Sequence, residues 1–65
     1  MNWDQIEGSW KKLKGRAKEE WGELTDDELD KAEGRRDQLA GALQQRYGHA
    51  KEDAERALDD WARRL

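Results

Sequence analysis

Large apolar residues recur every three or four positions over the first third of the chain. This spacing places one apolar stripe along an amphipathic helix. The stripe comprises Trp3, Ile6, Trp10, Leu13 and Ala17. The pattern predicts a single helix from the N-terminal residues to Trp21.

Both ends of this helix carry sequence signals. Asn2 and Gln5 have the spacing of a capping box, in which each side chain hydrogen bonds the backbone N–H of the other residue. Met1 and Ile6 occupy the positions of a hydrophobic staple. At the other end we expect Gly22 to stop the helix in a left-handed conformation.

A second helical region starts after Thr25, which has capping-box spacing to Glu28. Because the chain has no proline, the sequence leaves open whether residues 26–47 form one helix or two. The apolar phase weakens in the middle of this region. We therefore predict a short helix at 26–32, a bend, and a longer helix at 34–47.

A last helix is predicted over residues 50–64, after Tyr47-Gly48 repeats the aromatic–glycine stop. On its polar face, three acids each stand four residues before a base. This order stabilises a helix by about 0.2–0.5 kcal/mol per pair. The expected pairs are Glu52–Arg56, Asp59–Arg63 and Asp60–Arg64.

The chain also resembles itself at an offset of 26 residues. The pattern D-x-x-E-G-x(4)-L-x-G-x(5)-[WY]-G begins at Asp4 and again at Asp30. Such self-similarity indicates two related units that bury their apolar faces against each other. Together with the helical periodicity, it predicts an all-α fold, a small four-helix bundle of two pseudo-repeated helical hairpin units.

Composition limits the core. Only 34% of the 65 residues are hydrophobic, whereas 45% are charged, and the net charge is −3. The large apolar side chains are seven Leu, four Trp, one Ile, one Met and one Tyr. We therefore predict that the tryptophans form core rather than an exposed stacking surface, and that residues 1–65 make one domain near the lower size limit for folding unaided.

The same composition argues against several function classes. Without Cys there are no disulfides, thiolate metal sites or thiol chemistry. No apolar run is long enough to span a membrane, and the N-terminal residues lack the apolar stretch of a secretory signal. A core this small leaves little room for a buried catalytic cleft, so we expect no enzyme.

A basic stretch is the first candidate site. It comprises Lys11, Lys12, Lys14, Arg16 and Lys18, beside Trp10. Such a stretch can bind nucleic acid or an anionic membrane. These bases scatter around the helix and the whole chain is acidic, so we interpret them as a solvated face and do not expect nucleic acid as a partner.

Other chemistry-bearing residues lack partners in the sequence. His49 is the only histidine, whereas a metal site needs three or four ligands. Ser9 has no spaced His or acid, and the paired carboxylates lie on polar faces. These pairs are Glu19/Glu20, Asp26/Asp27 and Asp59/Asp60. We predict no catalytic, cofactor-binding or metal-ligating residue and no cofactor.

The six glycines form two triplets spaced by seven residues, at 8, 15 and 22 and at 34, 41 and 48. An exposed glycine inside a helix costs about 0.5–1 kcal/mol relative to alanine. Glycines 8, 15, 34 and 41 could therefore simply weaken the helices. Alternatively, they line a smooth face that another helix approaches, within the monomer or between copies. The sequence leaves both hypotheses open.

The order of these motifs resembles the CsbD-like family of small bacterial general-stress proteins. The matching segments are Gly8–Lys14, Lys18–Leu24, Thr25–Asp27, Glu33–Leu39 and Gln45–Gly48. The resemblance extends over roughly residues 2–61. It implies a compact four-helix protein of the bacterial cytoplasm, made under stress. It brings no catalytic or ligand-binding residues with it.

The mean hydropathy of −1.43 also resembles that of hydrophilins. From both likenesses we hypothesise a non-enzymatic protector of macromolecules, with weak homo-oligomers or many protein clients as partners. The alternative is an interaction module that binds itself or a specific partner through the glycine-lined face. A nucleic-acid-associated protein is the third hypothesis.

Overall fold

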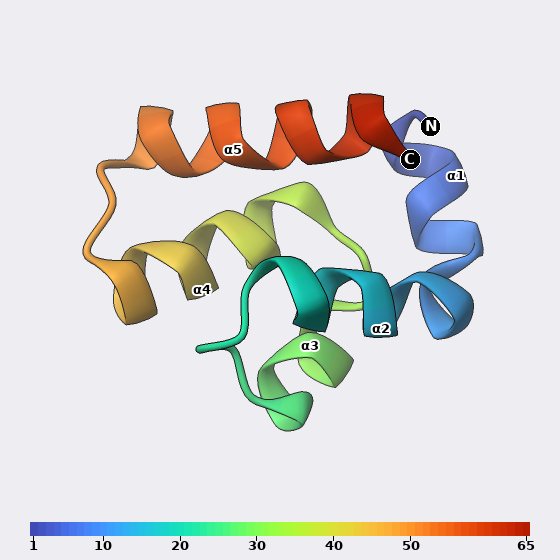
Figure 1. Ribbon diagram of the computed structural model, residues 1–65, viewed down its shortest axis with the longest axis horizontal. Coiled ribbons are helices and arrows are strands. Elements are labelled where there is room, and N and C mark those ends of the chain that lie inside the picture. The colour runs from blue at the N-terminus through green and yellow to red at the C-terminus, as the bar shows by residue number, and fades with distance from the viewer.

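The computed structural model describes residues 1–65, which form five helices and no strand. In Figure 1, α5 lies antiparallel to α4, α1 stands at one end, and α2 and α3 lie on the other side of α4. The bounds are α1 Trp3–Gly8, α2 Trp10–Glu20, α3 Asp26–Ala32, α4 Arg36–Tyr47 and α5 Lys51–Arg64. The prediction of an all-α fold is confirmed, with five helices rather than four.

Two of the helices begin where the sequence predicts, at reciprocal capping boxes. The Gln5 N–H donates to Asn2 Oδ1 at 2.8 Å, and the Asn2 N–H donates to Gln5 Oε1 at 3.0 Å. Thr25 and Glu28 make the same pair of bonds at the start of α3. Each box satisfies backbone donors that the first turn of a helix leaves without partners.

The predicted first helix is broken at Ser9, and this break produces the fifth helix. The Ser9 backbone (φ −114°, ψ 19°) leaves the helical region, and α2 restarts at Trp10. The restart allows the Trp10 indole N–H to donate to the Leu29 carbonyl at 2.8 Å in the core. A buried indole needs such a partner, and this contact with α3 cannot be read from local periodicity.

The prediction of a left-handed Gly22 is wrong. α2 does end before Trp21-Gly22, but Trp21 leaves the helix at φ −124°, ψ 79°, and Gly22 does not have a positive φ. The buried Trp21 ring stacks edge-on against Trp61, with centroids 5.2 Å apart. The Lys18 ammonium donates to the carbonyls of Gly22 and Leu24, so a side chain helps to close the turn without a left-handed glycine.

The region 26–47 forms two helices, as predicted, and α4 starts two residues later than expected. The bend uses consecutive left-handed residues, Glu33 at φ 55° and Gly34 at φ 77°. Gly34 is buried, not an exposed helical position as predicted. A Cβ there would lie 3.1 Å from Glu7 Cα and 3.1 Å from Trp10 Cε3. Gly34 is therefore required both by its φ angle and by a close approach.

One apolar cluster fills the interior. No charged or polar side chain is buried. Three of the four tryptophans are buried, as predicted, and Trp3 is half-buried against the cluster. Its fully buried large residues are Ile6, Leu24, Leu29, Leu39, Leu43 and Leu58. The predicted stop at Gly48 is confirmed, with φ 70° at the end of α4.

The predicted ion pairs along α5 are wrong in their partners. Arg56 and Arg63 pair with acids three residues before them, Asp53 and Asp60. Of the remaining predicted members, Glu52 makes no ion pair, whereas Asp59 and Arg64 pair with residues of other helices. Arg64 pairs with Glu20 at 2.9 Å and Asp59 pairs with Arg36 at 2.8 Å. Packing against α2 and α4 brings these stronger partners within reach.

Candidate functional site

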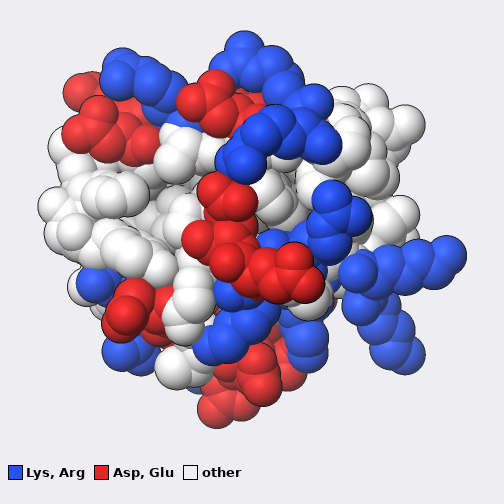
Figure 2. All heavy atoms as spheres, in the orientation of Figure 1, with Lys and Arg blue, Asp and Glu red and all other residues white.

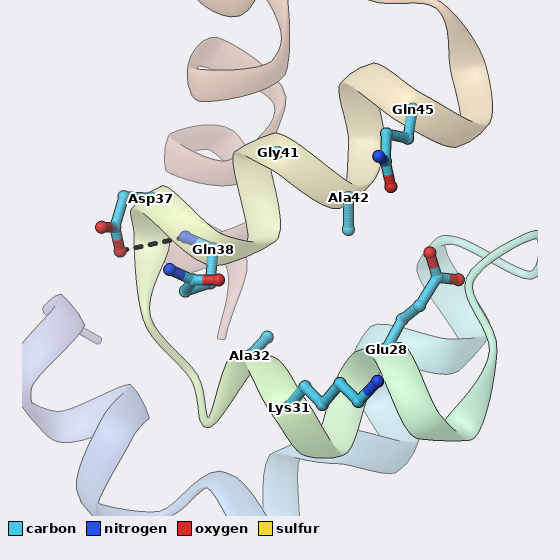
Figure 3. A pocket seen from close by; sticks show the side chains of 8 residues that line it. All are labelled: Glu28, Lys31, Ala32, Asp37, Gln38, Gly41, Ala42 and Gln45. Atoms are coloured by element: carbon cyan, nitrogen blue, oxygen red, sulfur yellow. Dashed lines mark hydrogen bonds between the residues drawn. The ribbon is translucent and has the colours of Figure 1, made fainter.

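A groove with a volume of about 490 Å³ lies between α3 and α4. Figure 3 shows Gln38, Ala42 and Gln45 pointing from α4 toward α3, with Ala32 pointing back at them. The lining residues are Glu28, Lys31, Ala32, Asp37, Gln38, Gly41, Ala42 and Gln45. The groove thus has a floor of small residues between amide and charged walls.

The two carboxylates of this groove differ in the hydrogen bonds that they accept. Glu28 accepts from the Thr25 N–H and from Arg46 Nε, at 2.9 and 3.0 Å. These two contacts, the Thr25 bond first, lower the pKa of Glu28. Asp37 accepts only from the Gln38 N–H, at 2.9 Å. The geometry keeps Glu28 ionised and structurally engaged, which is unlike a carboxylic acid poised for proton transfer.

The outward face of α4 is unusual for so charged a chain. Between Asp37 and Arg46 the helix carries no charge at all. A Cβ added at Gly41 would meet nothing within 4 Å. This uncharged face forms one wall of the groove, so a second chain segment could approach the α4 backbone closely here. Sequence periodicity alone does not predict the groove, because α3 and α4 come together only as a result of the bend at Gly34.

The predicted basic stretch is divided by the fold. Lys14 pairs with Asp30 of α3 at 2.6 Å, and this contact raises the pKa of Lys14. Lys18 is held by backbone carbonyls at the end of α2. Lys11, Lys12 and Arg16 remain exposed. In Figure 2, acidic and basic side chains interleave over the visible face, and no large area of one sign stands alone.

His49 lies in the turn between α4 and α5, its ring 5.6 Å from that of Tyr47. Its buried Nδ1 has no hydrogen-bond partner. No three His, Asp or Glu side chains gather in a way that could hold a metal ion. No helix has the length and apolarity needed to cross a bilayer.

A cluster of ion pairs and hydrogen bonds joins residues that lie far apart in the sequence. Arg36 donates to Asp59 through Nε and Nη2, and to Glu55 through Nη1 at 3.3 Å. The Trp3 indole N–H also reaches Asp59, at 3.3 Å. The Arg36 bonds, then the Trp3 bond, lower the pKa of Asp59, and its bond to Asp59 raises the pKa of Arg36. Asp59 thereby connects α1, α4 and α5.

Sequence comparisons identify known proteins that are similar to this chain. The CsbD-like family model matches residues 4–56. A UPF0337 protein of Pectobacterium atrosepticum is 57% identical over 61 residues, covering 94% of this chain and 88% of the relative. UPF0337 protein YjbJ of Escherichia coli is 52% identical over 64 residues, covering 98% and 93%.

A UPF0337 protein of Rhodopseudomonas palustris is 59% identical over 61 residues, covering 94% of this chain and 92% of the relative. These relatives come from different bacteria, and each match spans nearly the whole of both chains. The family model also reaches from α1 into α5. The chain belongs to the CsbD-like family, a family of the bacterial general stress response.

Proposed function

We propose that this protein is a non-enzymatic protector of macromolecules that acts in the bacterial cytoplasm during general stress. One observation carries the proposal. All 13 basic and 16 acidic residues stay at least partly exposed around a core of 14 buried hydrophobic residues. A surface of interleaved charges holds water and disfavours like-with-like association. Figure 2 shows this interleaving on one face.

The small core supports the second part of the mechanism, partial opening. Regions with few buried apolar contacts open at low free energy. Opening would expose Leu58 and Trp61, which otherwise lie buried at 0% and 3% exposure. These side chains would then cover apolar surface on a damaged client while the charged faces keep the complex in solution.

The test compares protection of a client enzyme during drying and heating. The protein should preserve more client activity than an equal mass of albumin. A variant with Lys11, Lys12 and Arg16 changed to Gln serves as a matched control. These three side chains are exposed and make no ion pair within the chain, so the fold should survive, and the loss of three of the 13 bases should lower the protection. Protection no better than that of albumin would contradict the proposal.

A partner-binding role is the second candidate, and the α3–α4 groove favours it. Gly41 lies in the groove wall with open space above it. A Gly41→Gln variant should fill the groove, whereas Gly15→Gln places the same side chain over open space on α2. In a crosslinking pull-down from stressed cells, a specific partner should be lost with Gly41→Gln alone. A broad set of weakly bound clients, unchanged by either variant, would favour the protector.

We also infer that the single domain consists of two pseudo-repeated units. In each, a short helix is followed by a longer one, α1 by α2 and α3 by α4. The longer helices begin at Trp10 and Arg36, and their separation equals the 26-residue offset of the sequence pattern. This correspondence supports duplication of a helical hairpin unit. The last helix, α5, follows the second unit and has no counterpart in the first.

A further inference from the structure

The junction between α4 and α5 is a turn of three residues, Gly48, His49 and Ala50 (Figure 1). Gly48 reverses the chain at φ 70°, and its N–H donates to the Gln44 carbonyl at 3.0 Å. A Cβ at Gly48 would meet nothing within 4 Å. His49 leaves its buried Nδ1 without a partner. No side-chain hydrogen bond of residues 48–50 therefore holds the turn in its present shape.

No side-chain cap fixes the start of α5. Its N-cap, Ala50, offers no side-chain hydrogen bond, as at the starts of α2 and α4 and unlike the capping boxes of α1 and α3. The first N–H groups of α5, like those of any helix, have no intrahelical acceptor, and here they have no capping side chain either. If residues 48–50 became helical, the carbonyls of residues 47–49 would accept from those groups. With no proline in the chain, α4 and α5 can continue as one helix over 36–64.

A continuous helix could no longer fold α5 back onto its own core. The face of α5 that would be left uncovered carries Ala54, Leu58, Trp61 and Ala62, all buried in the monomer. The polar contacts of α5 with other helices likewise lead to residues before the turn. These contacts are Asp59 with Arg36 and Trp3, Glu55 with Arg36, Arg64 with Glu20, and Ala62 with the Met1 ammonium.

The surface vacated by α5 is complementary, in shape and in charge, to another copy of α5. We propose that α5 exchanges between two copies of this chain, giving a reciprocal dimer in which Arg36 of each copy binds the partner's Asp59. Only residues 48–50 change conformation, and every contact of α5 re-forms across the two copies. The proposal does not depend on protective activity.

Charge reversal distinguishes exchange from ordinary association. In the Arg36→Asp variant, two negative charges face each other at positions 36 and 59. In the Asp59→Arg variant, two positive charges face each other there. In an exchanged heterodimer of the two variants, both intermolecular pairs become opposite in charge. We expect a 1:1 mixture, unfolded in urea and refolded together at high concentration, to give a heterodimer by light scattering. Its melting temperature should exceed that of either variant alone.

An ordinary heterodimer would leave each repulsive pair inside its own chain and would gain only the mass-action stabilisation of association, so its melting temperature would stay below that of the wild-type protein at the same concentration. The exchanged heterodimer should melt close to the wild type; monomers, or a heterodimer that melts below the wild type, would overturn the proposal. If either variant fails to fold alone, the more exposed pair Glu20→Lys and Arg64→Glu provides the same test. Glu20 and Arg64 side chains are 35% and 60% exposed, so each single variant should fold.

The turn itself gives a second, independent test. Alanine disfavours the left-handed conformation of Gly48 by about tenfold per hinge, so Gly48→Ala should raise the dimerisation constant on the order of a hundredfold for two hinges. Gly15→Ala is the matched control, because Gly15 lies within α2, outside the turn and the α3–α4 groove, and has the same open space. An equal dimerisation constant for the two variants in analytical ultracentrifugation would count against exchange at this turn.

Discussion

Arg36, the first residue of α4, holds Asp59 of α5 in a two-pronged hydrogen bond, with Nε to Oδ1 at 2.8 Å and Nη2 to Oδ2 at 2.9 Å. Planar pairs of this kind restrict orientation as well as distance. The relationship explains how a chain with a small apolar core fixes its last helix, because one carboxylate also receives the Trp3 indole N–H.

Removing the charge of Asp59 should therefore destabilise the fold. For Asp59→Asn we expect a loss of about 1 kcal/mol in the free energy of unfolding, since solvent screens a pair whose carboxylate is 44% exposed. Asp60→Asn is the matched control. Asp60 pairs only with Arg63 one turn away on the surface, so its change should stay within about 0.5 kcal/mol. Urea titrations of both variants decide; equal losses would contradict a special role for Asp59.

Stability should fall in acid. The pKa of Asp59 is lowered chiefly by Arg36, and that of Glu28 chiefly by the Thr25 N–H and then Arg46. A carboxyl with a lower pKa in the folded state binds fewer protons than when unfolded, where its pKa is about 4. Its contribution is full above about pH 5 and is lost as the pH falls through the folded pKa.

Urea midpoints at a series of pH values from 7 to 3 measure this dependence. The midpoint should stay nearly constant down to about pH 5 and then decrease. Asp59→Asn should flatten the decrease. A wild-type curve that stays level to pH 3 would show that these carboxylates do not stabilise the folded state.

Two glycines with opposite surroundings should respond oppositely to alanine. Gly34 is left-handed and lies against Glu7 and Trp10, so Gly34→Ala should cost about 2–4 kcal/mol. Gly15 lies within α2 under open space, so Gly15→Ala should stabilise by about 0.5–1 kcal/mol. Thermal unfolding followed by circular dichroism reports both signs. A stabilised Gly34→Ala would refute the close approach at the bend.

Helix caps offer a further contrast between two hydroxyl residues. Thr25 accepts from the Glu28 N–H at 3.1 Å, whereas the Ser9 side chain makes no cap bond to α2. Thr25→Ala should cost about 1 kcal/mol, and Ser9→Ala should change stability by less than half of that. The free energies of unfolding in urea test the contrast, and similar losses for both would show that the Thr25 bond does not stabilise α3.

The sequence identified individual residues of the candidate site but did not predict how they are arranged. The basic stretch was visible as a run, yet only folding shows that Lys14 faces Asp30 while Lys12 stays exposed. The sequence did not predict the groove, because Lys31 and Gln45 come to line the same groove only when the bend folds α3 onto α4. Contacts across such distances leave no period in the sequence.

The sequence by itself determined the helical class, the starts of α1 and α3, the left-handed stop at Gly48 and the residue types of the core. These features depend on side chains and backbone groups within a few residues of each other, such as Thr25 and Glu28. Local hydrogen bonds and conformational preferences form in the same way wherever the segment lies.

Only the tertiary structure decided the break at Ser9, the departure of Trp21 from α2 and the partners of the α5 charges. Each of these features gives a side chain a partner in a distant part of the chain. Trp10 finds the Leu29 carbonyl, Trp21 finds Trp61, and Asp59 finds Arg36 in place of the nearby Arg63. The free energy gained by burying an indole or pairing an arginine exceeds that of one helical turn or an exposed pair of neighbouring charges.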